Sequence, residues 1–325
     1  MSFKEQSDFR TEASLSKKEE TGEVLEIDKE TIEDGVWQPS IFKNFHSSLG
    51  MGASTKELKR NIGREDAKIR ITGRQDRFDR AFSDENSETR IDKICAGRII
   101  VNLLKRIAPE ANSHNIQKTA LEHGDNVVVV DQKYLDKEKD ERARILADGI
   151  VTDLKEIPLM VAAADCAPIG IYDSEHQSIG VFHSGWRGTL KQIARKGIRT
   201  MVENYNSKPE ELLVAVGPHA DGERFEVDEK VRQEFLNAKD QEGEQIYDLE
   251  EIETFFKINP DKSGSYFLDT GLAIKISLIK SGILEEHIQL SEYSTMSQEG
   301  NRLFSSERLE GKDARDSFAF IMALK

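Results

Sequence analysis

Three side chains with metal-binding or nucleophilic chemistry stand where short apolar runs begin or end. Cys166 follows the run 159–163, and His183 comes directly after the run 178–182. His123 lies in a His-Gly-Asp turn that precedes another apolar run. Runs of this length, bounded by polar or glycine-bearing segments, predict buried strands. Because loops at strand ends often carry function, these three residues are the leading candidates for a site.

Two imidazoles and one thiolate form a ligand set that zinc accepts. Three protein ligands leave one position of a tetrahedral ion open, which is typical of catalytic zinc sites. Such an ion lowers the pKa of the water that it activates by roughly eight units in the best-known enzyme. The wide spacing of His123, Cys166 and His183 matches no compact zinc motif. The residues alone therefore leave two alternatives open: a buried cysteine with ordinary loop histidines, or a metal-free pair of Cys166 nucleophile and His183 base.

Arg187 and Asp165, which are close in sequence to His183 and Cys166, also have candidate roles. A predicted helix follows the Gly-Trp-Arg-Gly segment at 185–188, and amide donors at a helix start, with Arg187 beside them, suit an anion such as phosphate. Alternatively, Trp186 packs in the core and Arg187 pairs with a carboxylate. Asp165 adjoins Cys166 and is a candidate acid or base, although a structural turn or cap carboxylate explains it equally well.

Three further histidines and the second cysteine are weaker candidates for a functional site. His176 stands in a predicted hairpin turn and is expected to be solvated. His46 and His219 lie in loops near glycines, where either could line a pocket. Cys95 belongs to the apolar stripe of a predicted helix, and we expect it to be a small buried residue.

The pattern of apolar residues predicts an α/β protein. Strands are predicted at 127–130, 159–163, 168–172, 178–182, 212–216, 288–293 and 318–324. Helices are predicted at 89–107, 190–202, 228–237 and 270–281. In the last helix we expect Leu272, Ile276 and Ile279 to face inward, and the acidic residues 238–265 predict an irregular insertion. Because strands and helices do not alternate strictly, we expect a mixed rather than an all-parallel sheet.

Composition limits the class of protein. The chain has 325 residues, a net charge of -14, 37% hydrophobic residues and two cysteines. The negative charge argues against a nucleic-acid partner, because phosphate backbones attract a surplus of Lys and Arg. We find no signal peptide and no run long enough to cross a membrane, and two cysteines cannot form a disulfide framework, so we expect a cytoplasmic protein. The polar residues 1–35 predict a flexible extension, with 36–325 as a single domain.

Four stretches together resemble a known family. They are HGDNVVVVD from His123, ADGIVTD from Ala147, ADCAPIGIYD from Ala164 and FHSGWRGTLKQIARKGI from Phe182. These motifs are similar to those of the YfiH-like, laccase-domain family, whose older name is multicopper polyphenol oxidase and whose members are now described as zinc-dependent purine nucleoside enzymes. The resemblance extends from Val36 to the C-terminus.

The resemblance implies a fold, a site and a reaction. In such proteins the histidine of the HG turn, the cysteine of ADC and the histidine before GWRG bind one metal ion, and these are His123, Cys166 and His183 here. The implied fold has two mixed sheets packed face to face with helices outside, an αββα arrangement. The implied activities are adenosine deamination and phosphorolysis of adenosine, inosine, guanosine and methylthioadenosine, with zinc, or alternatively copper, as the ion and phosphate as a second small substrate.

The sequence also departs from the family pattern. Leu121 and Ala164 stand where Gln and Thr are usual, Ser294 replaces a common cysteine, and residues 306–309 replace a Tyr-Arg-Arg-Asp run. These changes leave the metal ligands intact but raise the alternative of a non-catalytic, divergent member. Seven histidines scattered singly argue against a multicopper oxidase, whose several copper centres need many paired histidines.

Overall fold

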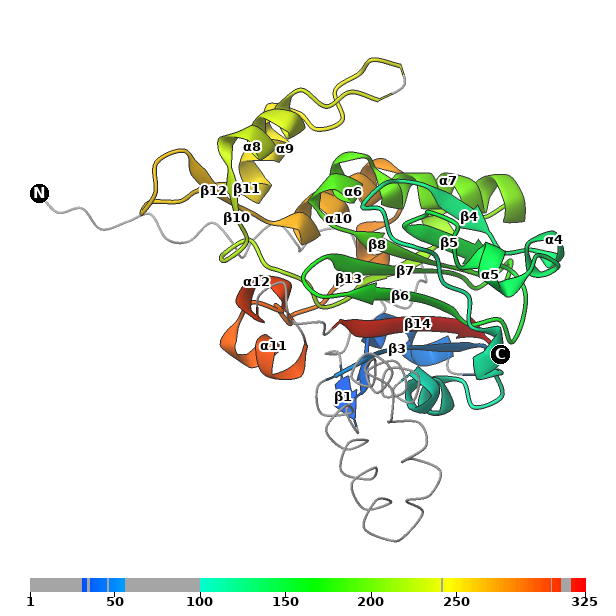
Figure 1. Cartoon of the computed structure of the whole chain (residues 1–325). Helices are drawn as coiled ribbons and strands as arrows, with labels where there is room; N and C mark the ends of the chain where they lie inside the picture. Colours follow the sequence, from blue (N-terminus) through cyan, green and yellow to red (C-terminus); the bar gives the residue numbers. More distant parts are fainter. Residues whose placement is uncertain are drawn as a thin grey trace, which may run out of the picture.

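Two sheets packed face to face form the centre of the molecule (Figure 1). The structure, a computed structural model, describes residues 31–33, 36–45, 47–55, 100–240, 242–304, 306–310 and 317–325. The five-stranded sheet has the order β1 (Thr31–Glu33), β2 (Val36–Gln38), β3 (Leu49–Ser54), β14 (Phe318–Leu324), β6 (Leu159–Ala163). The six-stranded sheet has the order β13 (Ile288–Leu290), β9 (Leu213–Val216), β7 (Ala167–Asp173), β8 (Ser178–Ser184), β5 (Gly149–Thr152), β4 (Val127–Val129). The second sheet is mixed, as predicted, because β4–β5 and β9–β13 are parallel and its other pairs are antiparallel.

The strands β7 and β8 are buried along their whole length, which explains their nearly continuous apolar sequence. Alternate side chains of these strands face the five-stranded sheet and the outer helices. The sheets approach closely at Gly170, where a Cβ atom would lie 2.7 Å from Sδ of Met322 and from Cε of Met51. The shared core is therefore formed by both inner faces, and Val161, Tyr172, Ile179, Val181, Phe318 and Phe320 are among its members.

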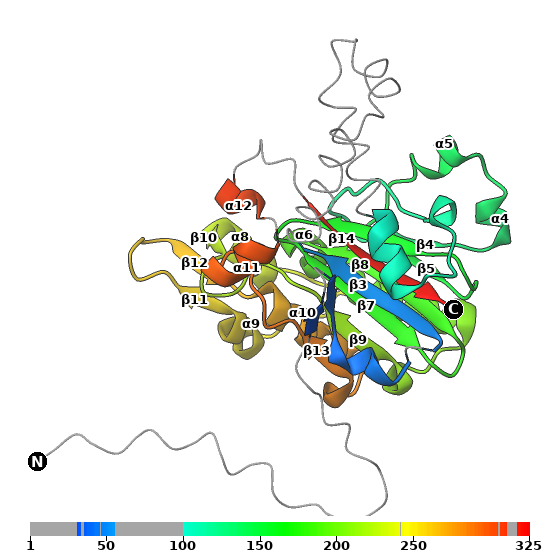
Figure 2. The same cartoon turned by 90° about the horizontal axis from the view of Figure 1, so that it is seen from below.

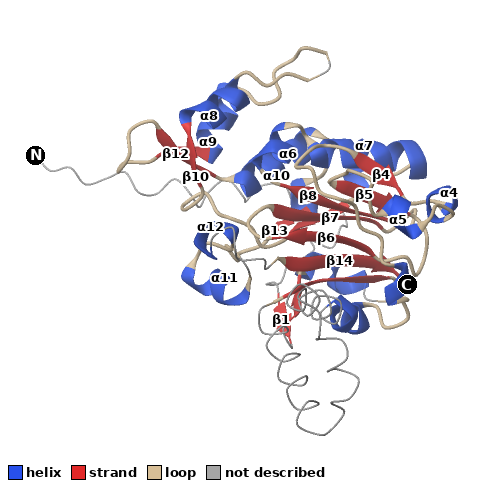
Figure 3. Cartoon of the chain, in the orientation of Figure 1, coloured by secondary structure: helices blue, strands red, loops and turns tan. Residues whose placement is uncertain are grey.

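Helices cover the outer face of each sheet (Figure 3). The helices α7 (Ile193–Tyr205) and α10 (Thr270–Lys280) pack on the six-stranded sheet, where Ile198 and Met201 contact the cluster that contains Ile169 and Val214. A helical segment at 100–107 packs on the five-stranded sheet through Leu103, Leu104 and Ile107. The implied αββα arrangement is thus confirmed.

A smaller lobe projects beside the two-sheet core (Figure 2). It consists of the three-stranded sheet β10 (Glu226–Asp228), β12 (Ser265–Leu268), β11 (Phe256–Ile258) with the helices α8 (Glu229–Leu236) and α9 (Leu249–Phe255). The prediction of an irregular insertion at 238–265 is therefore wrong. The helix α9 begins with a capping box formed by Asp248 and Glu251, so part of the acidic composition stabilises a helix start.

Two details of the predicted helices also differ. The helix expected at 190–202 is two helices, α6 (Trp186–Leu190) and α7, separated by Gln192 with a left-handed φ of 63°. In α10 the buried face contains Ala273, Ile274 and Leu278, whereas Ile279 is 40% exposed. This helix is apolar around most of its circumference, so the spacing of its apolar residues did not identify the buried face.

Short elements complete the described chain. They are η1 (Ser40–Phe45), η3 (Ser113–Asn115), α4 (Gln132–Leu135), α5 (Lys139–Arg142), η4 (Pro209–Glu211), η5 (Glu285–His287), α11 (Gln298–Leu303) and α12 (Glu307–Glu310). The strand β1 lies inside the predicted extension and pairs with β2, so regular structure begins before Val36. His46, Cys95 and residues 1–30 lie outside the described residues. Within the described part of the chain, no helix has the length and apolar character needed to span a membrane.

Candidate metal centre

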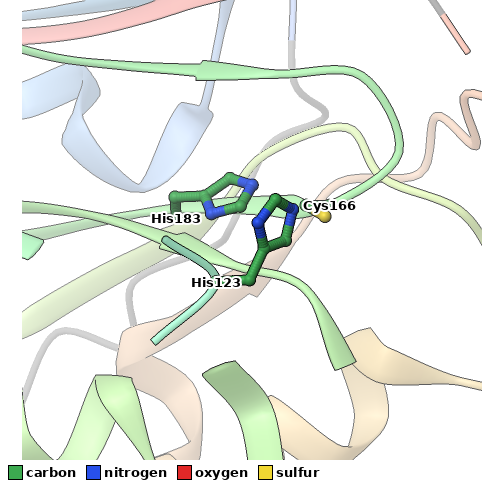
Figure 4. Close-up of side chains that lie close together, drawn as sticks. All are labelled: His123, Cys166 and His183. Carbon is green, nitrogen blue, oxygen red and sulfur yellow. The ribbon is translucent and has the colours of Figure 1, made fainter. Parts of the chain in front are cut away.

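The side chains of His123, Cys166 and His183 meet at one end of the six-stranded sheet (Figure 4). Their ligand atoms all lie within 4.8 Å of one another. The two imidazole rings are perpendicular, with centroids 5.0 Å apart and an interplanar angle of 85°. The predicted convergence of these three residues is therefore observed, and it involves residues up to 60 positions apart in the sequence (183 − 123 = 60).

The backbone around these residues explains why they meet. Cys166 immediately precedes β7 and His183 lies near the end of β8, and the antiparallel register pairs His183 with Pro168. His123 adopts the left-handed region with φ 56° in the turn before β4. Gly185 permits the close approach, because a Cβ atom there would lie 2.7 Å from the sulfur of Cys166. The hairpin and two tight backbone positions thus set the spacing of the three donors.

A buried carboxylate that the sequence analysis missed holds two of the donors in place. Asp148, fully buried, accepts hydrogen bonds from the backbone N–H groups of Glu122, His123 and Gly124 at 2.8–3.2 Å. It also accepts a bond from Nδ1 of His183 at 2.9 Å, which leaves Nε2 of that ring to face an ion. The sequence did contain a signal for this residue, because Asp148 stands between Ala and Gly at the start of an apolar strand. A carboxylate buried there needs hydrogen-bond partners, and its position therefore indicates a structural role.

The electrostatics of the cluster favour a thiolate. Burial raises the pKa of the Cys166 thiol, but hydrogen bonds with His123 and His183 outweigh burial and lower this pKa to about 7. Burial lowers the pKa of His183, but its bonds with Asp148 and Cys166 raise it to about 9. The pKa of His123 is raised, chiefly by its hydrogen bond with Cys166. Burial raises the pKa of Asp148, but the bond from His183 and the backbone donors bring it below its usual value.

A cavity of about 640 Å³ opens beside the cluster. The Arg187 guanidinium lies over the Trp186 ring, 4.2 Å from its centroid, and Arg308 lies over Phe225 at 5.0 Å. Among the described residues Arg187 forms no ion pair with a carboxylate, whereas Trp186 packs against a hydrophobic cluster as the alternative interpretation expected. Anion binding by Arg187 stays a prediction. The lining residues include His123, Cys166, Asp165, Arg187, Trp186, Phe225, Thr270, Glu307 and Arg308.

The other residues considered from the sequence fall in different places. Asp165 lines the cavity, and its carboxylate is bonded to neighbouring segments. His176 lies in the turn at the far end of β7 and contacts Asp173, so it is remote from the cluster. His219 is buried and directs Nδ1 to the carbonyl of Gly217 rather than into the cavity lining.

The donor set fits a zinc ion. Zinc binds imidazole nitrogen at about 2.0–2.1 Å and thiolate sulfur at about 2.3 Å. Donors within 4.8 Å of one another can share one such ion. The lowered pKa of Cys166 supplies the thiolate that ligation requires, and Asp148 orients His183 as carboxylates commonly orient metal-binding histidines. That these residues hold a metal remains a prediction.

The fold and the site together define an α/β protein in which two imidazoles and a thiol lie close together beside one cavity. Residues 100–323 match the family model described as multi-copper polyphenol oxidoreductase laccase. Because this match covers more than half of the chain, the protein belongs to this YfiH-like, laccase-domain family.

Curated relatives and solved structures agree with this assignment. The chain is 30% identical over 168 residues to purine nucleoside phosphorylase YlmD of Bacillus subtilis, a match that covers 52% of this chain and 56% of YlmD. It is 29% identical over 189 residues to adenosine deaminase RL5 of an unknown prokaryotic organism, covering 58% of this chain and 67% of that protein. The crystal structure of YlmD from Geobacillus stearothermophilus has a TM-score of 0.65 at 20% identity, covering 92% and 99% of the two chains. This last likeness supports the fold alone.

Proposed function

We propose that this protein is a metal-dependent purine nucleoside enzyme that catalyses adenosine deamination, nucleoside phosphorolysis, or both. The observation that carries the proposal is the His123, Cys166 and His183 cluster at the edge of a cavity lined by aromatic rings and guanidinium groups. The cavity volume of about 640 Å³ lies within the usual range for small-molecule sites. Relatives named as purine nucleoside phosphorylase and adenosine deaminase support the substrate class.

The proposed ion is zinc, held by the two imidazoles and the thiolate. Zinc bound there would act as a Lewis acid and make water a better nucleophile at neutral pH. Copper also accepts imidazole and thiolate ligands. The described residues contain one cluster of this kind, which favours a single-ion enzyme over multicopper oxidation.

For deamination, water adds to carbon 6 of adenine, the bond from this carbon to the amino nitrogen breaks, and ammonia leaves. The site must take a proton from the water and deliver one to the leaving nitrogen. Among the described residues, Asp165 and Glu307 are the carboxylates that line the cavity, and both are therefore candidates for proton transfer. The side chains of Trp186 and Phe225 contribute to the apolar part of the cavity lining, which suits a purine.

For phosphorolysis, a phosphate oxygen attacks C1′ of the ribose while the bond from C1′ to the purine nitrogen breaks. The products are ribose 1-phosphate and the free purine, which takes up the proton released by phosphate. In this proposal Arg187 holds the phosphate, because a guanidinium binds two of its oxygens at once.

Incubation of the purified protein with adenosine or inosine, with and without phosphate, tests the proposal. We expect ammonia from adenosine, or free base only when phosphate is present, together with about one zinc per chain. His123→Ala and Cys166→Ala should lose both the metal and the activity, whereas the exposed His114→Ala should retain them. Absence of turnover in a zinc-loaded wild-type protein would reject the enzymatic assignment and favour a non-catalytic role for the metal.

The geometry also supports a second candidate, a metal-free thiol hydrolase. Cys166 hydrogen-bonds with His183, whose other ring nitrogen is oriented by Asp148, and this is the order of groups in a cysteine–histidine–carboxylate triad. Metal analysis separates the candidates, because a thiolate that ligates zinc is not free to attack a substrate. Hydrolytic activity that survives complete removal of zinc, and that alkylation of Cys166 by iodoacetamide abolishes, would favour the hydrolase.

A further inference from the structure

Asp165 occupies an unusual position beside the metal cluster. Its φ of 141° lies in a region that residues with side chains rarely adopt. Its Oδ1 accepts a hydrogen bond from the hydroxyl of Thr295 at 2.7 Å, and its Oδ2 accepts one from the backbone N–H of Arg308 at 2.9 Å. The hydroxyl of Ser306 is a third partner. The carboxylate is thus engaged by three donors that all belong to the C-terminal part of the chain.

The backbone of the turn 164–166, which contains Asp165, also forms hydrogen bonds with the C-terminal segment. The N–H of Glu307 donates to the carbonyl of Ala164 at 3.0 Å, next to the bond between Arg308 and Asp165. On its other side, the carbonyl of Asp165 accepts the N–H of Ala220 at 2.9 Å. The turn that carries Cys166 therefore fixes where Glu307 and Arg308 lie.

Arg308 and Arg187 both line one cavity, and their guanidinium groups lie over two rings of the same lining. Each lies over an aromatic ring, and neither forms an ion pair within 4.0 Å with a carboxylate of the described residues. Stacking on a ring occupies the face of a guanidinium and leaves its N–H donors at the edge. Both arginines are exposed, and the carboxylates of Asp165 and Glu226 interact electrostatically with Arg308. Two guanidinium groups beside one cavity, with no ion pair to the described part of the chain, suit a ligand that carries negative charge.

We propose that Arg308 is a specificity-determining residue that binds a phosphate group together with Arg187, and that Asp165 is a positioning residue that holds Arg308 in place. The choice of phosphate rests on the proposed function, and its source is either inorganic phosphate or the 5′-phosphate of a purine nucleotide. Asp165 then acts through hydrogen bonds rather than as the acid or base that its sequence position suggested. Glu307, whose carboxylate has no such bonds to the turn, becomes the carboxylate available for proton transfer.

The binding arm of the test needs no turnover. Isothermal titration of the zinc-loaded full chain with inorganic phosphate, and separately with adenosine 5′-monophosphate, measures both sources. We expect Arg308→Ala to weaken binding of at least one ligand about tenfold or more, and Arg308→Lys to restore it only in part, because lysine lacks the two-pronged geometry. The matched control is Arg232→Ala, which also removes an arginine stacked on a ring, that of Tyr266, but lies outside the cavity lining. No phosphate binding in wild type, or equal binding in Arg308→Ala, would overturn the proposal even if nucleosides are turned over.

Asp165→Asn tests the positioning role. If Asp165 positions Arg308, the Asp165→Asn variant should bind phosphate more weakly and have a raised KM for phosphate. The shape of its pH profile for adenosine deamination should be unchanged. The double variant with Arg308→Ala should bind phosphate no worse than Arg308→Ala alone, because the two changes remove one function. A fall in kcat of about 100-fold with loss of one limb of the pH profile, at unchanged phosphate affinity, would instead identify Asp165 as the acid or base.

Discussion

The two-sheet core and the smaller lobe contribute differently to the same cavity. From the core come His123, in the turn before the half-buried strand β4, and Cys166, in the turn before the fully buried strand β7. From the lobe comes Phe225, which packs in a separate cluster of aromatic rings. Trp186 joins the two regions, because it follows β8 in the core and packs against the lobe cluster.

This difference indicates a division of function between the regions. The core fixes the distances between donors through strand register and a buried carboxylate. The lobe provides one wall of the space that a ligand would fill, through short elements held together by side-chain packing. Changes in the core should therefore affect the metal, and changes in the lobe should affect ligand binding. Substitutions in each region can test this division.

The largest effect is expected for Asp148→Ala in the core. This change leaves the His183 ring and three backbone N–H groups without their buried acceptor. We expect the free energy of unfolding to fall by about 3–5 kcal/mol and metal affinity to fall about 10- to 100-fold. Urea denaturation and zinc titration against a chelator measure both. Asp173→Ala removes a buried carboxylate at the far end of β7 and should leave zinc affinity unchanged; equal zinc affinity in the wild type and Asp148→Ala would contradict the orienting role.

The corresponding change in the lobe is Phe235→Ala. This ring is fully buried against Tyr247, Phe255 and Phe256, with centroids 5.3–5.8 Å away. We expect a loss of about 3 kcal/mol or more in unfolding free energy and weaker nucleoside binding, at unchanged zinc content. Denaturation and metal analysis of the same preparation test this. Loss of zinc in this variant would show that the two regions do not act separately.

The acidity of Cys166 provides a third test, within the core. After zinc is removed by a chelator, alkylation of Cys166 by iodoacetamide, followed by mass spectrometry of its peptide, should rise with an inflection near pH 7 rather than near the ordinary thiol value of 9.0. The pKa of Cys166 is lower in the folded than in the unfolded protein, so the thiolate stabilises the folded state. This contribution to the free energy of unfolding is complete above pH 9 and is lost as the pH falls through 7. Asp148→Ala should move the inflection upward, since it removes the partner that raises the pKa of His183. An inflection at 9 in wild type would contradict this account.

The smallest effect is expected at the contact between the regions. The hydroxyl of Tyr247 accepts a hydrogen bond from Gln192 at 2.9 Å and donates to the carbonyl of Ala273 at 3.2 Å. Tyr247→Phe should reduce the free energy of unfolding by about 1 kcal/mol, because it leaves the amide of Gln192 with one partner fewer. Denaturant unfolding measures this, with Tyr266→Phe as a control that is expected to change little. A loss as large as that of Phe235→Ala would indicate that this contact holds the lobe in place.

The sequence predicted the core well because its strands are apolar on both faces. The run Leu159–Ala163 coincides with β6, and the three donors were found because thiol and imidazole chemistry is rare and stood at strand ends. Asp148 and Arg308 were missed because their proposed roles depend on contacts between residues that are distant in the sequence. For example, the backbone N–H of Arg308 donates to Asp165, which is 143 positions away. Within the lobe, the predicted helix at 228–237 corresponds to α8. The elements α9, β11 and β12 were missed because their apolar residues are spaced among acidic ones with no clear period.

The pairing of His183 with Pro168 has a consequence for how the site can vary. In an antiparallel ladder, a shift by one residue turns every side chain to the opposite face of the sheet. The imidazole near the end of β8 and the sulfur just before β7 therefore cannot drift apart gradually while the hairpin stays paired. Alignment of these two strands therefore brings Cys166 and His183 together in one event, and the turn before β4 has to add His123 to complete the centre.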